Sequence, residues 1–517
     1  MKNAAALALS LVFALSFADA AKAQVTLDIA GGLSGETAVF TVGGTPPPGE
    51  FVILTLSDTK GPLPVGLLLP GQPGAWDQDL SMFNYPAFFQ VAPVTNPFAV
   101  IPLAAVTPAF AGLHLFSQAW TVPGPTSFLD QKSNVVTLLF GAHGVSTPTL
   151  SPPLAPHAFF NAVPLASGGI LVTGGGNGIG GAGSASAEVY DPKTAEFAAT
   201  ANLPAARAGG VAIRLNDGRV LLAGGLDGTG AVTAACELYD PSTNTFAATG
   251  SLLTGRALFA GAKLADGRVL VCGGSTSVSG TDVVSQLLAL VSNATSSAET
   301  YNPATGTWSG AAAMPATRSG HIAAALPDGR VLVAGGVQPG ILGIPQFLTT
   351  ASRYNPTTNA WNATASMGTS GRALSSAAVL NDGRVMVAGG LNANILALTA
   401  SAVADVSIFN NANNTWQNGP NLSAGRYTHT LTTLPDGRVV AAGGLTGTVS
   451  TTMAPTTLAS VEAYTPAPSA WAPLFDMLEP RSAAGAALTP DGKRIVVIGG
   501  ANDFGPIDPP TSELYVP

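Results

Sequence analysis

The stretch LPDGRVLVAGG, from Leu326 to Gly336, has close relatives throughout the second part of the chain. Each copy ends on a glycine doublet, and successive doublets are roughly 49 to 62 residues apart, which is the range of propeller blades. The doublets are Gly174-Gly175, Gly224-Gly225, Gly273-Gly274, Gly335-Gly336, Gly389-Gly390, Gly443-Gly444 and Gly499-Gly500. Seven copies of one unit predict a ring of seven similar blades.

Each copy carries the signals of four strands. Before the doublet, a short apolar run such as Val385 to Ala388 follows an Asp-Gly turn, which predicts a strand buried on both faces, strand B. An arginine opens the segment before that turn, which we expect to be strand A. A tyrosine or phenylalanine downstream and a second aromatic residue then mark strands C and D. The strand-D aromatic residues are Phe197, Phe246, Trp308, Trp361, Trp416 and Trp471.

A glycine doublet followed by Glu-x-Tyr, an aromatic residue and an arginine resembles the kelch repeat. One copy shows the whole pattern in Gly224-Gly225, Glu237, Tyr239, Phe246 and Arg256. The resemblance implies that each repeat is a four-stranded blade, with strand A innermost around a central channel. It also implies that the strand-D aromatic residue packs between blades.

The first 23 residues have the layout of a cleavable secretory signal. Lys2 precedes an apolar stretch from Ala4 to Phe17, and Ala21-Lys22-Ala23 precedes Gln24. We therefore expect export to the periplasm or the extracellular space, with a mature chain that starts at Gln24. No later stretch reaches the length of about 18 apolar residues that a membrane-spanning helix needs, so we expect no transmembrane segment.

Residues 24–143 lack the repeat and carry short strand signals such as Phe51 to Leu56 and Val135 to Phe140. About seven such strands separated by Gly and Pro turns predict a β-sandwich domain, for which an immunoglobulin-like form is one option. Residues 144–517 hold the repeats. The last copy stops at Pro517 without a strand D, so we expect the segment from Gly144 to Leu150 to close the ring.

The predicted fold class is thus all-β: a seven-bladed kelch-type β-propeller preceded by a small antiparallel β-sandwich. Composition agrees, because 61 Gly, 40 Pro and only 10% charged residues are typical of a turn-rich β protein. The net charge of −8 and the absence of a basic tract argue against a nucleic-acid partner.

The two cysteines allow two interpretations. Cys236 stands where other copies have Ala187 and Ala298, and Cys272 also stands at an alanine position, so both fit small buried residues. Export would permit a disulfide, which forms only if the two Cα atoms lie within about 7 Å of each other.

One face of the predicted disc collects the starts of strands A and C and the ends of strands B and D. The candidate binding residues there are Arg207, Arg256, Arg318, Arg372, Arg426, Arg481 and His157, which stands at the arginine position of the first copy. These arginines either satisfy the strand-C glutamates inside the fold or also bind an anion through bidentate contacts.

The loops between strands B and C are the least alike parts of the repeats, and two of them are apolar. Val283 to Val291 and Ile341 to Ile344 either form a lid, pack against the N-terminal domain, form a docking patch for another protein, or pack on neighbouring loops.

Kelch-type seven-bladed propellers include radical copper oxidases of the galactose oxidase type, which this chain resembles in outline. That resemblance implies a site of two histidines, two tyrosines and a cysteine joined to one tyrosine. The chain has five histidines, none next to a tyrosine, so we expect no metal and no cofactor. The histidines are His114, His143, His157, His321 and His429.

We therefore expect a monomeric, exported binding protein without enzymatic activity, whose ligand is a protein or a carbohydrate. One alternative is a carbohydrate-active or oxidoreductase enzyme that uses the same propeller face, since an enzyme would gather titratable groups around one pocket. Another alternative is a cell-surface structural module without a defined ligand.

Overall fold

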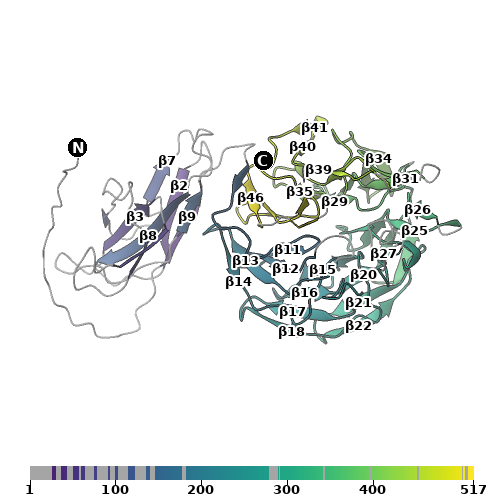
Figure 1. The fold of residues 1–517 in the computed structure, drawn as a ribbon, viewed down its shortest axis with the longest axis horizontal. Helices are drawn as coiled ribbons and strands as arrows, with labels where there is room; N and C mark the ends of the chain where they lie inside the picture. The colour runs from purple at the N-terminus through teal and green to yellow at the C-terminus, as the bar shows by residue number, and fades with distance from the viewer. Residues whose placement is uncertain are drawn as a thin grey trace. The chain divides into compact units, whose positions relative to one another are not determined.

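The computed structural model describes strands between residues 26 and 139, and residues 146–517 apart from 177–181, 279–288, 290, 342–343, 369, 395–398, 451–452, 503–504 and 507–509. The chain divides into two compact units (Figure 1): residues 1–143 with 193–195, and the remainder from residue 144 to 517. The expected signal sequence lies outside the described residues. Within them, no helix is both long and apolar enough to cross a membrane.

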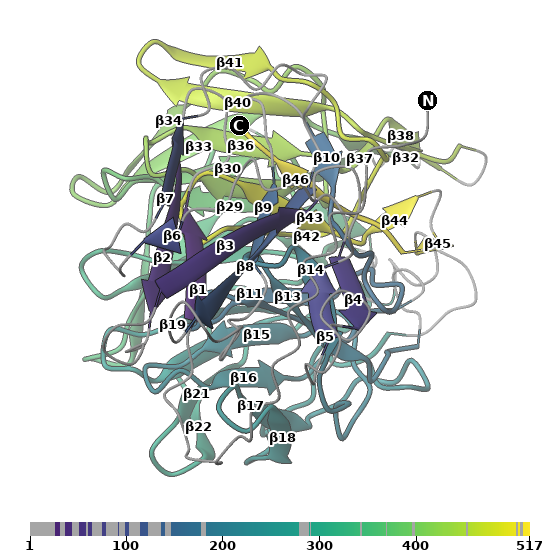
Figure 2. The ribbon, with the colours of Figure 1, turned by 90° about the vertical axis from the view of Figure 1, so that its left-hand side faces the viewer.

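The described strands of the N-terminal unit form two larger antiparallel sheets and the two-stranded sheet β4-β5. One has the order β1-β2-β7 and the other the order β6-β3-β8-β9, in which β3 and β8 lie side by side (Figure 2). Strand β1 contacts β8 and β9 of the second sheet, which gives the small sandwich of the predicted fold class. The strands are β1 (Thr26–Ala30), β2 (Thr37–Gly43), β3 (Phe51–Ser57), β4 (Lys60–Pro64), β5 (Ala75–Gln78), β6 (Val91–Ala92), β7 (Ala99–Pro102), β8 (His114–Val122) and β9 (Val136–Leu139).

Seven four-stranded antiparallel sheets form the propeller. Blades 1 to 3 are β11 (Asn161–Pro164), β12 (Ile170–Thr173), β13 (Ala187–Asp191) and β14 (Glu196–Ala199); β15 (Val211–Arg214), β16 (Val220–Ala223), β17 (Cys236–Asp240) and β18 (Thr245–Ala248); and β19 (Ala260–Lys263), β20 (Val269–Cys272), β21 (Ala298–Asn302) and β22 (Thr307–Ala311). Within each blade these four strands are A, B, C and D in chain order.

Blades 4 to 6 follow the same order, and blade 7 takes its fourth strand from the start of the propeller. They are β23 (Ile322–Ala325), β24 (Val331–Ala334), β27 (Ala351–Asn355) and β28 (Ala360–Ala363); β29 (Ser376–Val379), β30 (Val385–Ala388), β33 (Val406–Asn410) and β34 (Thr415–Asn418); β35 (Thr430–Thr433), β36 (Val439–Ala442), β40 (Val461–Pro466) and β41 (Ser469–Pro473); and β42 (Gly485–Leu488), β43 (Ile495–Ile498), β46 (Ser512–Tyr515) and β10 (Ser146–Pro148).

The strand-A elements form the inner wall of the ring. Each contacts the strand A of the next blade, and β11 of blade 1 contacts β42 of blade 7, so the series closes. The segment from Gly144 to Leu150 contains β10, which pairs antiparallel with β46. Residues from both ends of the propeller sequence therefore share one sheet.

The strand-B elements show why this sequence folds into blades. In blade 5, Asp382 and Gly383 form the turn before β30, and Gly383 has a φ of 81°, a left-handed conformation that glycine adopts without strain. Strand β30 then carries only apolar residues, all at most 1% exposed. Removing each of the three larger side chains, Val385, Met386 and Val387, from water contributes on the order of 1.5 to 3 kcal/mol.

The hydrophobic core lies between neighbouring blades. One cluster joins Leu221 of blade 2 to Val271 and Trp308 of blade 3, and similar clusters join the blades that follow. Trp361 of blade 4 donates its indole N–H to the carbonyl of Ala312, which follows blade 3, at 2.7 Å. The strand-D aromatic residues therefore pack between blades, as the kelch resemblance implies.

Candidate functional site

The structure corrects the predicted start of strand A. Each arginine lies four residues before its inner strand, so that Arg372 precedes β29, which begins at Ser376. The second residue after the arginine has a left-handed φ, 54° at Leu374, and this turns the chain before the extended strand can begin. The residues with this conformation are Phe159, Gly209, Leu258, Gly320, Leu374, Thr428 and Ala483.

The side chains of the six predicted arginines are all buried, and Arg256 shows what they contact. Its Nη1 donates to the carbonyls of Gly273, at 2.8 Å, and Ser297, at 3.0 Å. Its Nη2 donates to the carboxylate of Glu299 at 2.6 Å. The arginine thus joins the end of strand B to strand C within its own blade.

Glu299 also holds the connection between strand D of one blade and strand A of the next, called here the D–A connection. Its carboxylate accepts the backbone N–H of Leu253 at 2.7 Å and of Thr254 at 3.0 Å. The arginine and the glutamate together therefore fix the D–A connection on the blade. The equivalent ion pairs are Arg207–Glu237, Arg426–Glu462 and Arg481–Glu513.

His157 takes the arginine's place in blade 1. Its Nε2 lies 2.8 Å from Glu188 Oε1, and its Nδ1 lies 2.6 Å from the carbonyl oxygen of Gly174. Both ring nitrogens therefore face oxygen acceptors of the same kinds that the guanidinium groups contact in the other blades.

Blades 4 and 5 have serine where the other blades have the strand-C glutamate. Arg372 donates to Ser407 Oγ at 2.8 Å and lies 3.8 Å from the carboxylate of Asp405. Arg318 donates to the backbone of Gly335 and Thr350. Burial lowers the pKa of Arg318 and of Arg372 to about 10, so both remain charged at neutral pH.

The burial of these arginines distinguishes between two roles, pairing with groups inside the fold and binding an anionic ligand. Each side chain is at most 2% exposed and contacts its own blade. Among the described residues, no hydrogen bond or ion pair joins one of these arginines to another. The geometry therefore supports the structural role over a ring of guanidinium groups that faces a ligand.

A closed ring of backbone hydrogen bonds surrounds the channel at the D–A connections, and the sequence reasoning missed it. The N–H of each left-handed residue donates to the carbonyl of its counterpart in the previous blade, as Leu374 does to Gly320 at 2.8 Å. The N–H of Phe159 completes the ring by donating to the carbonyl of Ala483 at 3.2 Å. The two glycines at this position were the available signal in the sequence.

Two buried histidines lie next to the arginines. Burial, with a smaller contribution from the nearby arginine charges, lowers the pKa of His321 and of His429 to about 3. His321 Nε2 lies 3.7 Å from Cys272 Sγ. Cys236 and Cys272 are both free thiols, and burial raises the pKa of Cys272 to about 12. Within the described ranges, no three His, Cys, Asp or Glu side chains lie close enough together to hold a metal ion.

The B–C loops of blades 4 to 7 form small sheets of their own. Phe347 of the blade 4 loop packs against two apolar clusters, one that contains Val337 and one that contains Leu391 and Leu445 of the two following loops. Packing between neighbouring loops therefore accounts for part of their apolar character. The apolar stretch Val283 to Val291 lies mostly outside the described residues. The loop strands are β25 (Val337–Pro339), β26 (Pro345–Phe347), β31 (Leu391–Asn394), β32 (Thr399–Ala402), β37 (Leu445–Thr446), β38 (Thr448–Val449), β39 (Thr456–Thr457), β44 (Ala501–Asn502) and β45 (Gly505–Pro506).

Large apolar side chains remain exposed on the same side of the disc. Ile341 is 86% exposed in a B–C loop, and Phe475 is 68% exposed in a D–A connection. In the described part of the chain, seven of the eight exposed large apolar residues lie in these two kinds of loop, which we call the loop face. The seven are Leu154, Leu253, Ile341, Ile344, Met453, Phe475 and Leu478, and the eighth, Val379, ends strand A on the opposite side.

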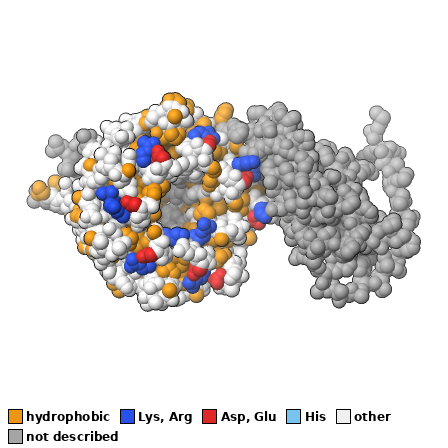
Figure 3. Space-filling view, turned by 180° about the vertical axis from the view of Figure 1, so that it is seen from behind, with side chains coloured by type: hydrophobic (Ala, Val, Ile, Leu, Met, Phe, Trp, Pro, Cys, Tyr) orange, Lys and Arg blue, Asp and Glu red, His pale blue; other side chains and the backbone are white. Residues whose placement is uncertain are grey.

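The opposite side carries the A–B turns and is polar. In blade 5, Arg384 Nη2 lies 2.7 Å from Asp382 Oδ2 of the same turn, and this hydrogen-bonded contact lowers the pKa of Asp382. Four other turns repeat the pair. Figure 3 shows basic and acidic side chains side by side at intervals around a central hollow. Among the described residues, Val379 is the one exposed large apolar side chain on this side, which therefore has less exposed apolar surface than the loop face.

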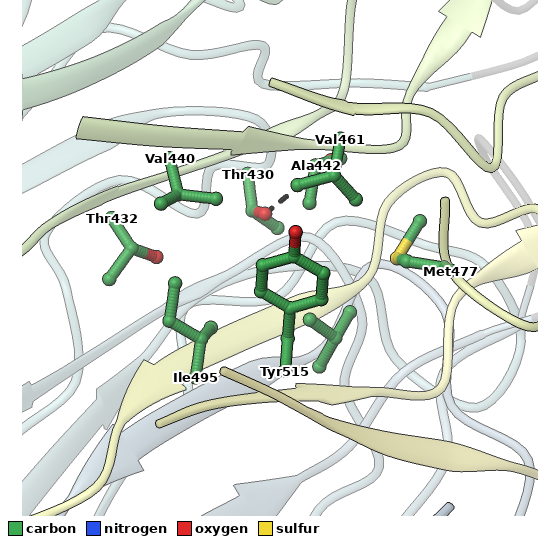
Figure 4. A pocket seen from close by; sticks show the side chains of 9 residues that line it. Thr430, Thr432, Val440, Ala442, Val461, Met477, Ile495 and Tyr515 are labelled. Carbon is green, nitrogen blue, oxygen red and sulfur yellow. Dashed lines mark hydrogen bonds between the residues drawn. The ribbon is translucent and has the colours of Figure 1, made fainter. Parts of the chain in front are cut away.

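A small apolar space lies inside the propeller between blades 6 and 7 (Figure 4). Val440 and Val461 of blade 6 face Ile495 and Tyr515 of blade 7 across it. Nearly all of its lining side chains belong to the core between the two blades. We therefore regard this space as packing between blades and not as a ligand site.

Comparisons with known proteins agree with this fold. A family model described as the kelch motif matches residues 318–368. The mouse protein Kelch-like protein 35 is 29% identical over 177 residues, which are 34% of this chain and 26% of that protein. The matched part of the chain thus spans about a quarter of that relative's length.

Two solved structures are similar in fold. A fungal alcohol oxidase of the AA5 family, in complex with copper, has a TM-score of 0.57 and 18% identity, over 72% of this chain and 76% of that one. The protein YjhT has a TM-score of 0.47 and 16% identity, over 63% of this chain and 99% of that one. The repeat pattern, the seven blades and the kelch-motif match at residues 318–368 together show a kelch-type, seven-bladed β-propeller.

Proposed function

We propose that this chain is an exported kelch-repeat binding protein that holds a protein or carbohydrate ligand on its loop face. Kelch repeats suggest a protein-interaction module. The layout of residues 1–23 supports export.

The distribution of exposed apolar side chains carries the proposal. Seven of the eight exposed large apolar residues in the described ranges belong to the loop face. Exposed apolar surface of this kind is typical of interaction sites, since water solvates it poorly. The charged A–B turns of the opposite side provide no comparable surface.

The buried arginines support this function indirectly. Arg481 contacts Glu513, and Glu513 accepts the N–H of Leu478 at 2.7 Å. The exposed side chain of Leu478 is thus held by a backbone that two buried charges fix in place. A rigid loop loses less conformational entropy when a ligand binds, which favours affinity.

The test begins with a search for ligands of the purified chain on peptide-display libraries and glycan arrays. Affinity for each ligand found is then measured for two loop-face variants, Phe475→Ser/Leu478→Ser and Ile341→Ser/Ile344→Ser. Val379→Ser is the matched control, because Val379 is the one exposed large apolar residue on the other side among the described residues.

We expect at least one loop-face variant to bind at least about tenfold more weakly, which corresponds to about 1.4 kcal/mol. We expect Val379→Ser to bind as the unmodified chain does. Equal affinity in all three variants, or a loss confined to Val379→Ser, would contradict the proposed face.

A further inference from the structure

Blade 4 departs from the arginine–glutamate pattern more than any other blade. Its strand C carries Ser352 at the position of Glu299 in blade 3. The shorter serine side chain brings no carboxylate to Arg318, although this arginine is only 1% exposed. Blade 5 also has a serine here, but its Arg372 lies 3.8 Å from Asp405.

The donors of Arg318 show what the missing glutamate leaves unpaired. In blade 7, Arg481 Nε and Nη2 both donate to Glu513 Oε1, at 2.9 and 2.8 Å. In blade 4, Arg318 Nη2 donates only to Thr350 Oγ1 at 3.2 Å. Its Nε is buried without a partner, as Nε also is in Arg207 and Arg426, which do have a glutamate. The donor that the missing glutamate leaves without a carboxylate is therefore Nη2, which donates to the glutamate in the paired blades.

No nearby group in the described structure supplies the opposite charge. No Asp or Glu forms an ion pair with Arg318 there. The pKa of the neighbouring Cys272 is raised to about 12 by burial, so its thiol is neutral. The pKa of His321 is lowered to about 3, mainly by burial, so its ring is neutral as well. A buried cation without a counter-charge is costly, so an anion is favoured beside it.

A backbone donor completes the arrangement. In blades 3 and 7 the N–H of the residue two before the arginine, Thr254 or Glu479, donates to the strand-C glutamate. Ala316 holds that position in blade 4. We propose that Arg318, the hydroxyl of Ser352 and the N–H of Ala316 bind a compact monovalent anion of halide size, which replaces the carboxylate that the other blades carry in their own sequence.

Bromide is the probe, because it has the charge of chloride and an anomalous signal in diffraction. Crystals of the purified chain grown with bromide as the only halide should show an anomalous peak at hydrogen-bond distance from Arg318 Nη2 and Ser352 Oγ. Ser352→Glu restores the carboxylate found in blade 3, so the peak should disappear in that variant. Arg256, whose pair with Glu299 is complete, is the internal control and should show no peak.

A second measurement does not depend on crystals or on the variant. The melting midpoint of the unmodified chain should rise with bromide concentration, at constant ionic strength set with gluconate, as ligand binding to the folded state requires. A wild-type map with bromide on the surface and none at Arg318 would overturn the proposal. So would water alone at Arg318, or an equal bromide peak beside Arg256, which would indicate an adventitious ion only.

Discussion

Leu258, Leu374 and Thr428 have left-handed backbone conformations, with φ between 50° and 54°, although none is glycine. In residues that have a Cβ, this backbone conformation costs roughly 1 to 2 kcal/mol. The ring of backbone hydrogen bonds around the channel offsets that cost, because each left-handed residue donates its N–H to the previous blade. The conformation is therefore a property of the repeat and not of the residue type.

Gly320 is one of the two glycines in this ring, and we predict that Gly320→Ala destabilises the propeller by about 1 to 2 kcal/mol. Its φ is 61°, and an added Cβ would lie 3.2 Å from Leu374 Cδ2. Urea unfolding measures the change. The control is Gly310→Ala, because Gly310 has an ordinary φ and a Cβ there meets no atom within 4 Å. If the urea midpoint of Gly320→Ala is no lower than that of Gly310→Ala, the ring of backbone hydrogen bonds does not impose the left-handed conformation at this position.

The buried histidines predict acid sensitivity. The pKa of His321 and of His429 is about 3 in the folded chain, against the usual value of 6.5 for histidine, so the unfolded chain binds these protons first as the pH falls. Above a pH of about 6.5, the two histidines do not change the free energy of unfolding with pH. As the pH drops from there towards 3, the free energy of unfolding falls. Two such residues cost about 2.7 kcal/mol per pH unit in this window.

His321→Phe/His429→Phe tests this acid sensitivity. Phenylalanine is already present at the same repeat position as Phe259, which is 7% exposed. Urea midpoints measured from pH 7 to pH 5 should fall less steeply for the double variant than for the unmodified chain. If the urea midpoints of the two chains fall equally steeply with pH, other groups cause the loss of stability in acid.

At the scale of the element, β10 joins the beginning of the propeller to its end. The N–H of Thr149, just after β10, donates to the carbonyl of Ser512 at 3.1 Å, and the two hydroxyl groups lie 2.6 Å apart. Pro148 lies within β10, which is tolerated because a strand at the edge of a sheet can leave one N–H position unpaired. The last blade thus depends on a few bonds across a long sequence separation.

Thr149→Pro should weaken this closure, because proline has no N–H to donate to Ser512. We expect faster hydrogen exchange at the amides of β46 in blade 7 and little change in blade 3. Thr149→Val is the matched control, since it keeps the N–H and removes only the hydroxyl. If the β46 amides exchange at the same rate in Thr149→Pro and Thr149→Val, the backbone hydrogen bond from Thr149 to Ser512 does not hold the blade.

At the scale of the whole molecule, the repeat made the fold predictable. The seven glycine doublets and the strand-D aromatic residues recur at regular positions, so one copy supports the interpretation of the next. The missing fourth strand of the last copy pointed to the segment that contains β10. The N-terminal sandwich rested on weaker signals, because its strands do not repeat.

The candidate site was harder to predict from the sequence. Arg256 and Glu299 could be matched by position, but the sequence could not show whether the guanidinium faced the channel or the blade. The direction of the guanidinium follows from the left-handed residue two positions after each arginine. That residue is glycine in only two copies, Gly209 and Gly320. The exposed side chains of the loop face are also set by tertiary packing, since neighbouring apolar loop residues such as Phe347 are partly buried.

The central claim is that each arginine before strand A holds the strands of its own blade and the D–A connection in place, which leaves ligand binding to the loop face. The free energy of unfolding of Arg256→Met, from urea titration, tests it most directly. The double variant Arg256→Met/Glu299→Gln is the control for the buried charge, because glutamine is neutral and its one carbonyl oxygen still accepts one of the two N–H groups, of Leu253 or Thr254, that the carboxylate accepts. Arg318→Met removes an arginine that has no glutamate partner.

We predict that Arg256→Met loses about 3 to 5 kcal/mol, because Glu299 is then a buried charge without a partner. The double variant should recover part of that loss, and Arg318→Met should lose less than Arg256→Met. If Arg256→Met unfolds at the same urea concentration as the unmodified chain, the arginine does not hold the blade and the account of the site is wrong.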